Sequence, residues 1–295
     1  MSLQQWILWI VLALSALPSV QASTYTQFLD AGGWKAKSSV FTCELIQDVP
    51  YYGDAVFATR AGESSQFYLK AEASRLKTGQ ASLVARTPVW LEHEKKIDLG
   101  FVSVKQGLKP VVLKSAPTER MLAELYNGHE LVFTRKPWYG AEESSQVAIT
   151  TVGFREAYDR YLGCLAGLLP VNFDQIKRTA VYFGSNQFED IGSSQLSKLD
   201  NIVAYVKADP SVKEFYIDGH TDSVGSREEN LALAQKRAEE VTRYLVNKGV
   251  PKSAIISRWH GERYPVSPND SVNNRAKNRR VTIRLERVTP PPSQS

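Results

Sequence analysis

An acidic and a basic residue in the second half of the chain are placed so that they could border one ligand cleft. Asp222 lies in a turn just after a predicted strand, Phe215–Ile217, and Arg237 lies on the helix that follows. The carboxyl ends of strands in α/β folds are common ligand sites. A carboxylate there can accept from an ammonium, and a guanidinium can bind a carboxylate with two hydrogen bonds. The pair therefore suits a zwitterionic ligand, although a surface salt bridge between the two residues fits the spacing equally well.

The helix that carries Arg237 must position this site. Ser226 and Glu229 have capping-box spacing, so the helix is predicted to begin there and to run to Asn247. At about 100° per residue, one apolar stripe faces the core, formed by Leu231, Ala234, Ala238, Val241 and Leu245. Asn230, Leu233 and Arg237 form a second cluster, about 80–90° around the helix from that stripe.

Strands and helices alternate around this helix. Strands are predicted at Ala180–Phe183, Phe215–Ile217, Ile255–Trp259 and Val281–Leu285, and a helical stripe runs from Leu196 to Val206. Such alternation indicates an α/β unit.

This region contains four motifs, which are Asp218-Gly-His-Thr-Asp-Ser-Val-Gly225, Asn230-Leu-Ala-Leu-Ala-Gln-Lys-Arg-Ala238, Gly261-Glu-Arg-Tyr-Pro265 and Asn278-Arg-Arg-Val281. In this order they resemble the OmpA-like module that binds peptidoglycan. The resemblance covers about residues 178–287. It implies a βαβαββ fold that holds the diaminopimelate of the peptidoglycan stem peptide, whose side chain carries an ammonium and a carboxylate on one carbon.

The same resemblance implies individual roles for residues of this chain. Asp222 and Arg237 would bind the zwitterion, Asn230 and Leu233 would line the pocket, and Arg279 would close it, with Arg280 adjacent. Ala234 stands where members of the family often have Ser. The peptidoglycan contacts that we expect are Asp222, Arg237, Asn230, Leu233, Thr221 and Arg279.

The first half of the chain is predicted to be mostly antiparallel β structure, barrel-like or sandwich-like, with a closing helix. Strand-like runs separated by turn residues occur at Ser39–Ile46, Ala55–Arg60, Gln66–Ala73, Ala81–Trp90, Ile97–Val104, Val111–Ser115, Glu130–Phe133 and Gln146–Val152. Apolar residues then recur at helical spacing from Phe154 to Leu165. The whole chain is therefore expected to be a two-domain α+β protein, since 295 residues suit two domains of roughly 150 residues each.

Residues 1–22 indicate a secretory signal peptide. They contain no Asp, Glu, Lys or Arg, and the apolar run Trp6–Leu17 is shorter than the ~20 residues that a membrane span needs. A small-x-small pattern follows at Val20-Gln-Ala22. An uncleaved membrane anchor is the alternative. No Cys lies near this cleavage point, so a lipid anchor is not expected.

The sequence has two cysteines, Cys43 and Cys164. An even number of cysteines in an exported chain favours a disulfide, which would tie the first strand to the closing helix. Two buried free thiols are the alternative.

The first half contains the run Cys43-Glu-Leu-Ile-Gln-Asp-Val-Pro-Tyr-Tyr-Gly-Asp-Ala-Val-Phe57, then Ala58-Thr-Arg-Ala61, and Cys164 just before Leu168-Leu-Pro-Val-Asn-Phe173. These residues are similar to the N-terminal domain of the flagellar MotY family. The resemblances divide the chain into a signal peptide at residues 1–22, a β-rich domain that binds the basal body or a partner at 23–170, an OmpA-like peptidoglycan-binding domain at 171–288, and a disordered tail at 289–295.

Together the resemblances imply a non-enzymatic component of the flagellar motor in the periplasm. It would bind peptidoglycan, dock on the basal body in a ring of the T-ring type, and work with a MotX-like protein to hold stator complexes. A general OmpA-like or Pal-like tether to peptidoglycan, unrelated to motility, is the alternative.

Other classes of function are not expected. His93-Glu94 and His129-Glu130 begin like a zinc-protease signature, but Ile97 and Phe133 stand where the second histidine would be. No cofactor, metal or peptidoglycan cleavage is therefore expected. Nucleic-acid binding is disfavoured by export and by the net charge of −4 over residues 171–240. After residue 22, no segment is long and apolar enough to span a membrane.

Overall fold

The computed structural model describes residues 23–27, 32–73, 76–88, 90, 91, 93, 95–136 and 144–288. The predicted signal peptide and the predicted C-terminal tail lie outside these residues. Contacts divide the chain into two compact units. One comprises residues up to Thr59 together with Ser64–Ala166, and the other comprises Arg60–Glu63 together with the chain from Gly167 onward. None of the helices in the described residues is long and apolar enough to cross a membrane.

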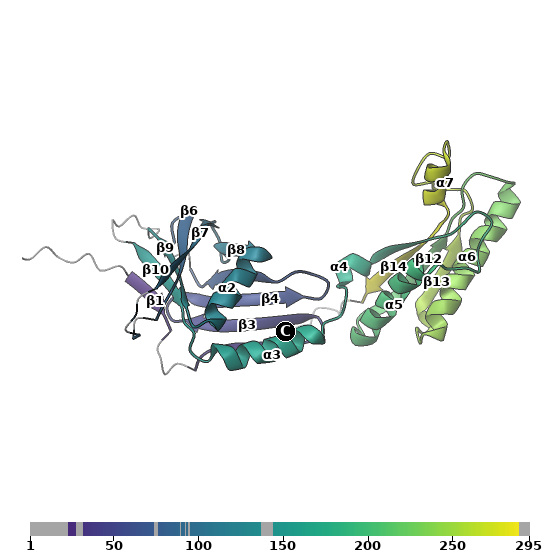
Figure 1. Ribbon diagram of the computed structural model, residues 1–295. Coiled ribbons are helices and arrows are strands. Elements are labelled where there is room, and N and C mark those ends of the chain that lie inside the picture. The colour runs from purple at the N-terminus through teal and green to yellow at the C-terminus, as the bar shows by residue number, and fades with distance from the viewer. Residues whose placement is uncertain are drawn as a thin grey trace, which may run out of the picture. The chain divides into compact units, whose positions relative to one another are not determined.

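Two five-stranded sheets form the first unit (Figure 1). One has the strand order β1-β10-β9-β6-β7, and the other has the order β2-β3-β4-β5-β8. β1 pairs with β10 in parallel, and the other pairings recorded in these sheets are antiparallel. The strands are β1 (Ser23–Thr26), β2 (Lys35–Ser38), β3 (Thr42–Val49), β4 (Gly53–Arg60), β5 (Gln66–Ala71), β6 (Gly79–Arg86), β7 (Lys96–Val104), β8 (Val111–Lys114), β9 (Glu130–Arg135) and β10 (Ser145–Ile149).

The core of this unit lies between the two sheets. Phe67 on β5 stacks on Phe133 on β9, with ring centroids 5.6 Å apart and nearly parallel planes. Each side chain is fully buried, as the alternation of the strands requires. Within the described residues the sheets form no closed barrel, so the sandwich-like alternative of the sequence analysis describes this unit better.

Two helices pack on the first unit, α2 (Ala116–Tyr126) and α3 (Phe154–Ala166). α3 lies along β2 and β3 (Figure 1). It carries Cys164, which is bonded to Cys43 on β3, with the two Cα atoms 5.9 Å apart. The predicted disulfide between the first long strand and the closing helix is confirmed, and both cysteines are accounted for.

Several of the strands predicted in the first half have different boundaries in the structure. The run Ser39–Ile46 is interrupted because the hydroxyl of Ser39 accepts from the backbone N–H groups of Phe41 and Thr42, at 3.2 and 2.9 Å. This local turn lets β2 and β3 pair as a hairpin, so β3 begins at Thr42. The strand predicted at Ala81–Trp90 ends earlier, at Arg86.

The second unit is a four-stranded sheet with its two long helices on one face (Figure 1). The strand order is β11-β14-β12-β13, and β12 pairs in parallel with β13 and antiparallel with β14. All elements of the predicted βαβαββ order are present, and a short helix, α7, is inserted before the last strand. The elements are α4 (Phe173–Ile176), β11 (Arg178–Tyr182), α5 (Ser193–Ala208), β12 (Val212–Gly219), α6 (Arg227–Asn247), the 3-10 turn Lys252–Ala254, β13 (Ile255–Trp259), α7 (Val272–Asn278) and β14 (Arg280–Arg287).

α6 packs against the sheet through the predicted apolar stripe, with one exception. Ala234, Ala238, Val241 and Leu245 are fully buried, whereas Leu231 is 42% exposed. The reason is the length of β12, which ends at Gly219, next to the backbone of Ala234. A Cβ atom at Gly219 would lie 2.1 Å from the carbonyl oxygen of Ala234, so only glycine fits this approach. Leu231, one turn earlier on the helix, lies beyond the end of the strand.

Candidate functional site

Asp222 lies three residues beyond the end of β12, where its carboxylate is paired with Arg279. Oδ2 of Asp222 accepts from Nη1 of Arg279 at 2.9 Å, and Oδ1 accepts from the backbone N–H of Val224 at 3.2 Å. The two charged side chains are 9% and 14% exposed. Arg279 also donates from Nε to the carbonyl of Phe183, at 3.3 Å. The ion pair is therefore held by groups from three separate parts of the chain.

Arg237 does not form an ion pair with Asp222 in this structure. Its guanidinium donates to three backbone carbonyls, those of Gln187 at 2.8 Å, Gly184 at 2.9 Å and His220 at 3.2 Å. The salt bridge that the sequence spacing allowed is thus replaced by hydrogen bonds to the loops that follow β11 and β12.

Arg237 keeps its charge although the residue is fully buried. Burial and the nearby Arg279 lower its pKa to about 10, and the negative charge of Asp222 acts in the opposite direction. A guanidinium has five N–H donors. The three carbonyls use three of them, one on each nitrogen, which leaves two N–H groups that no carbonyl uses. Asp222, Arg279 and Arg237 together place one negative and two positive charges at one end of the sheet.

Asn230 and Thr221 lie at the same end of the sheet as Asp222. The side chain of Asn230 is buried and donates to Glu262, at 3.1 Å. The backbone N–H of Thr221 donates to the carbonyl of Gly261, at 2.8 Å. The hydroxyl of Thr221 is buried and has no hydrogen-bond partner among the described residues. These contacts tie the loop at residues 261–265 to the loop that carries Asp222.

Leu233 is the remaining residue that the sequence analysis expects at the site. It is half-buried on α6, one turn before Arg237. The structure therefore brings together Asp222, Arg279, Arg237 and Thr221, and connects Asn230 to them through Glu262.

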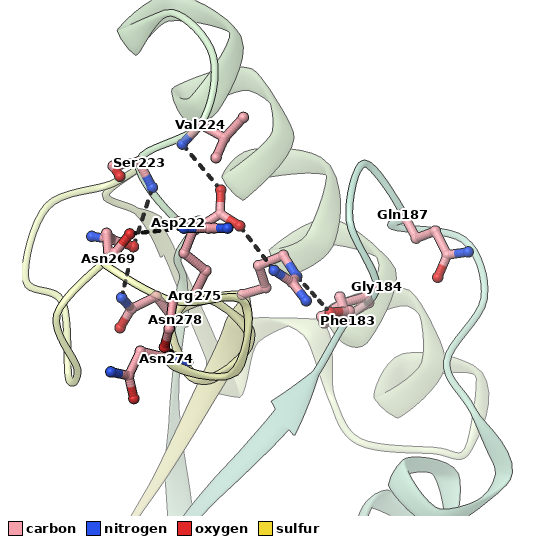
Figure 2. Close-up of polar contacts among 12 residues, drawn as sticks. Phe183, Gly184, Gln187, Asp222, Ser223, Val224, Asn269, Asn274, Arg275 and Asn278 are labelled. Carbon is pink, nitrogen blue, oxygen red and sulfur yellow. Dashed lines mark hydrogen bonds and ion pairs between the residues drawn. The ribbon is translucent and has the colours of Figure 1, made fainter.

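Two asparagines that the sequence analysis did not single out hold the loop at residues 266–271. Asn278 is fully buried; its Oδ1 accepts from the N–H groups of Val266 and Ser267, and its Nδ2 donates to the carbonyl of Ser267 and to Oδ1 of Asn269. Oδ1 of Asn269 also accepts from the N–H of Ser223, beside Asp222 (Figure 2). The sequence offered one signal for this role, the position of Asn278 at the start of the last motif.

Arg279 and Arg280 point to different groups. Arg280 is 5% exposed and donates to the carbonyl of Tyr264 at 3.1 Å and to the carbonyl of Asn278 at 3.5 Å. Burial lowers the pKa of Arg280. Of these two arginines, it is Arg279 that contacts Asp222.

Two stacked histidines lie beside the loops of the site. The rings of His220 and His260 are 5.1 Å apart, and Nε2 of His260 lies 3.0 Å from Asp218, which also forms two hydrogen bonds with Arg258. Burial, together with the positive charge of Arg280, lowers the pKa of His220 to about 4. His220 is therefore neutral at pH 7, and its backbone carbonyl is one of the three that Arg237 binds.

Comparisons with known proteins decide the family. The MotY N-terminal domain model matches residues 25–170, and the OmpA family model matches residues 182–279. The chain carries a MotY N-terminal domain followed by an OmpA-family domain. The candidate site belongs wholly to the OmpA-family domain.

The chain is similar to individual proteins over different parts of its length. The sodium-type flagellar protein MotY of Vibrio parahaemolyticus is 26% identical to this chain over 296 residues, which is 97% of this chain and 99% of that protein. The peptidoglycan-associated lipoprotein of Haemophilus influenzae is 35% identical over 109 residues, which is 37% of this chain and 70% of that protein. Among solved structures, the C-terminal domain of Helicobacter pylori MotB is 25% identical, with a TM-score of 0.35 over 38% of this chain and 86% of that chain.

Proposed function

We propose that this protein is a non-enzymatic component of the flagellar motor in the periplasm. In this proposal the OmpA-family domain binds peptidoglycan through the diaminopimelate of the stem peptide, and the MotY N-terminal domain docks on the basal body in a ring of the T-ring type. With a MotX-like partner, the bound protein holds stator complexes near the rotor. The similarity to a flagellar MotY along nearly the whole chain supports the assignment to the motor.

The observation that carries the binding proposal is the arrangement of Asp222, Arg279 and Arg237. Each carboxylate oxygen of Asp222 accepts one hydrogen bond from the protein, so each retains a lone pair for an ammonium. The unused N–H groups of Arg237 and those of Arg279 can donate to a carboxylate. A side chain with an ammonium and a carboxylate on one carbon can bind Asp222 through the ammonium and the arginines through the carboxylate at the same time.

Hydrogen bonds within the protein hold the loops of the proposed site in place. The loops that carry it are held by Arg237 through three carbonyls and by Asn278 through four hydrogen bonds. Binding therefore requires little ordering of the protein, which leaves more of the interaction energy for affinity. The hydroxyl of Thr221, buried without a partner in the described structure, offers one further hydrogen bond to the ligand.

Co-sedimentation of the full-length protein with purified sacculi tests this proposal. Asp222→Asn removes the negative charge with little change of volume, and Asp190→Asn is the matched control because Asp190 is an exposed carboxylate of the same domain. Removal of one partner from a desolvated charge pair costs about 2–5 kcal/mol, or roughly thirty-fold or more in affinity. We expect that Asp222→Asn no longer co-sediments with sacculi and that Asp190→Asn still does. Co-sedimentation of both variants would contradict the proposed site.

A second function, a general envelope tether unrelated to motility, is favoured by one observation. The OmpA-family domain alone is 35% identical to a peptidoglycan-associated lipoprotein. The two functions differ in what the MotY N-terminal domain binds. We expect a tagged copy to co-purify with basal bodies and to leave its polar or motor-associated position in cells that lack them. An unchanged, even distribution around the envelope in both kinds of cell would favour the tether.

A further inference from the structure

Tyr264 is an exposed aromatic residue held in an unfavourable backbone conformation beside the proposed peptidoglycan site. It is 68% exposed, and its φ angle is +60°, in the left-handed region that glycine and asparagine adopt most easily. A large side chain at such a position is strained, and its apolar ring gains little from burial in this structure. Strain of this kind persists where the surrounding structure enforces it, and it is concentrated at functional sites.

Arg280 and His260 hold Tyr264 in this conformation. The guanidinium of Arg280, 5% exposed, donates to the Tyr264 carbonyl at 3.1 Å. The Tyr264 ring contacts the ring of His260 at 5.4 Å, with the two planes nearly perpendicular, and His260 is held by Asp218. The backbone of Tyr264 is thus held by Arg280 and its ring packs on His260, while most of the side chain is exposed to solvent.

The loop of Tyr264 is attached to the residues around Asp222. The carbonyl of Gly261 accepts from the N–H of Thr221 at 2.8 Å, and Glu262 accepts from Asn230 at 3.1 Å. Tyr264 follows Gly261 by three residues, which limits their separation to about 10 Å even in an extended chain. A ligand held at Asp222 can therefore extend to the Tyr264 ring.

We propose that the ring of Tyr264 stacks against a sugar of the glycan strand while the stem peptide is held at Asp222. This inference rests on the proposed function and extends it from the peptide to the glycan. A sugar ring presents a face of C–H groups with hydroxyls at its rim, which suits an aromatic ring that is apolar on its faces and polar at one end. Diaminopimelate is the third residue of the stem peptide counted from the sugar, so about 10 Å of extended peptide separates the two groups. That length is similar to the ~10 Å that three residues of extended chain allow between Tyr264 and Gly261, which is bonded to Thr221 beside Asp222.

Two soluble ligands separate the glycan contact from the peptide contact. One is a disaccharide-tetrapeptide that contains diaminopimelate, and the other is the same tetrapeptide released from its sugar. Their affinities for the full-length protein are measured by calorimetry. If an aromatic contact contributes what buried ring pairs do, we expect the wild type to bind the disaccharide-tetrapeptide roughly tenfold more tightly.

Tyr264→Asn and Tyr264→Phe are the decisive variants. Asparagine accepts the positive φ angle but has no aromatic ring, so Tyr264→Asn should fold at least as stably as the wild type. We expect it to bind both ligands with the affinity that the wild type has for the free tetrapeptide. Tyr264→Phe keeps the ring and should retain most of the preference for the sugar-bearing ligand.

Three outcomes would overturn the inference. If Tyr264→Asn lowers the affinity for both ligands equally, the ring contacts the peptide or shapes the pocket. If Tyr264→Asn still binds the disaccharide-tetrapeptide more tightly than the free tetrapeptide, the proposed glycan contact is wrong. If that variant also no longer co-purifies with basal bodies, the ring binds a protein partner instead. If the wild type binds neither ligand, the proposed function fails and this inference fails with it. If Asp222→Asn abolishes binding of both ligands while Tyr264→Asn leaves both affinities unchanged, only the glycan contact is overturned.

Discussion

Asp222 and Arg279, 57 positions apart in the chain, form an ion pair of 2.9 Å between Oδ2 and Nη1 at the end of the sheet. Both side chains are largely buried, so the two charges compensate each other in a site with little water. The proposed ligand would enter a site whose acidic group already has a basic partner.

Arg279→Ala should therefore weaken folding as well as ligand binding. Removing one member of a buried ion pair leaves the other charge uncompensated, which costs roughly 3–5 kcal/mol. We expect the free energy of unfolding, measured with urea, to fall by about that amount, and sacculus binding to be lost. Arg284→Ala is the control, because Arg284 is 42% exposed and exposed ion pairs contribute about 1 kcal/mol or less. Equal stability of the two variants would show that the Asp222–Arg279 pair contributes little.

Arg237→Lys tests whether Arg237 is needed for the shape of the site as well as for its charge. Lysine keeps the charge, but a single ammonium cannot reproduce the planar set of donors that binds three carbonyls. A buried carbonyl without a partner costs about 1–3 kcal/mol. We expect a loss of roughly 3 kcal/mol in unfolding free energy and increased hydrogen exchange in the loops at residues 184–187 and 220–225. Wild-type stability with weakened sacculus binding would instead assign Arg237 to the ligand alone.

The buried His220 should make stability depend on pH. Its folded pKa of about 4 lies below the ordinary value of 6.5, so the unfolded state binds more protons between these values. Stability from the neutral imidazole is therefore present above pH 6.5 and is lost as the pH falls toward 4. The charged and titratable groups that face His220 are Arg280, Asp218 and His260.

The lowered pKa of His220 corresponds to a decrease of roughly 3 kcal/mol in unfolding free energy as the pH falls from 6.5 to 4. His220→Asn should flatten the pH dependence of the urea midpoint between pH 6.5 and 4. A slope that persists in the variant would have to come from other groups.

The disulfide between Cys43 and Cys164 should stabilise the first unit. It closes a loop with a sequence separation of 121, and removal of a native disulfide typically costs 2–5 kcal/mol. We expect Cys43→Ser together with Cys164→Ser to lower the thermal midpoint of the first unit while the OmpA-family domain keeps its own transition. Non-reducing mass spectrometry of periplasmic material should show the cross-linked peptides; free thiols there would contradict the bridge.

The sequence predicted the long elements well because each carries a strong local signal. α6 has a capping box at Ser226 and Glu229 that the structure contains, with both hydrogen bonds present. β1 and β2, of four residues each, were not predicted, since short polar strands have no clear alternation. α7 and α4 were missed because helices of seven and four residues have too few turns for a periodic pattern.

The partners at the site were harder to predict than its residues. Helical geometry placed Arg237 near Asp222 but could not show that its donors go to Gly184, Gln187 and His220, because those contacts depend on the folding of loops far apart in sequence. Likewise, the choice between Arg279 and Arg280 depends on how α7 meets β14. Such details follow from tertiary packing, which leaves no local pattern in a single sequence.

The position of the disulfide has a mechanical consequence for a protein that would connect two large structures. A pulling force applied through the chain after residue 166 enters the first unit at the end of α3, two residues beyond Cys164. Without a cross-link, that force would peel α3 from the sheet one turn at a time. The bond to Cys43 passes the load directly to β3, a strand with neighbours on both sides, so that many hydrogen bonds must break together before the unit yields.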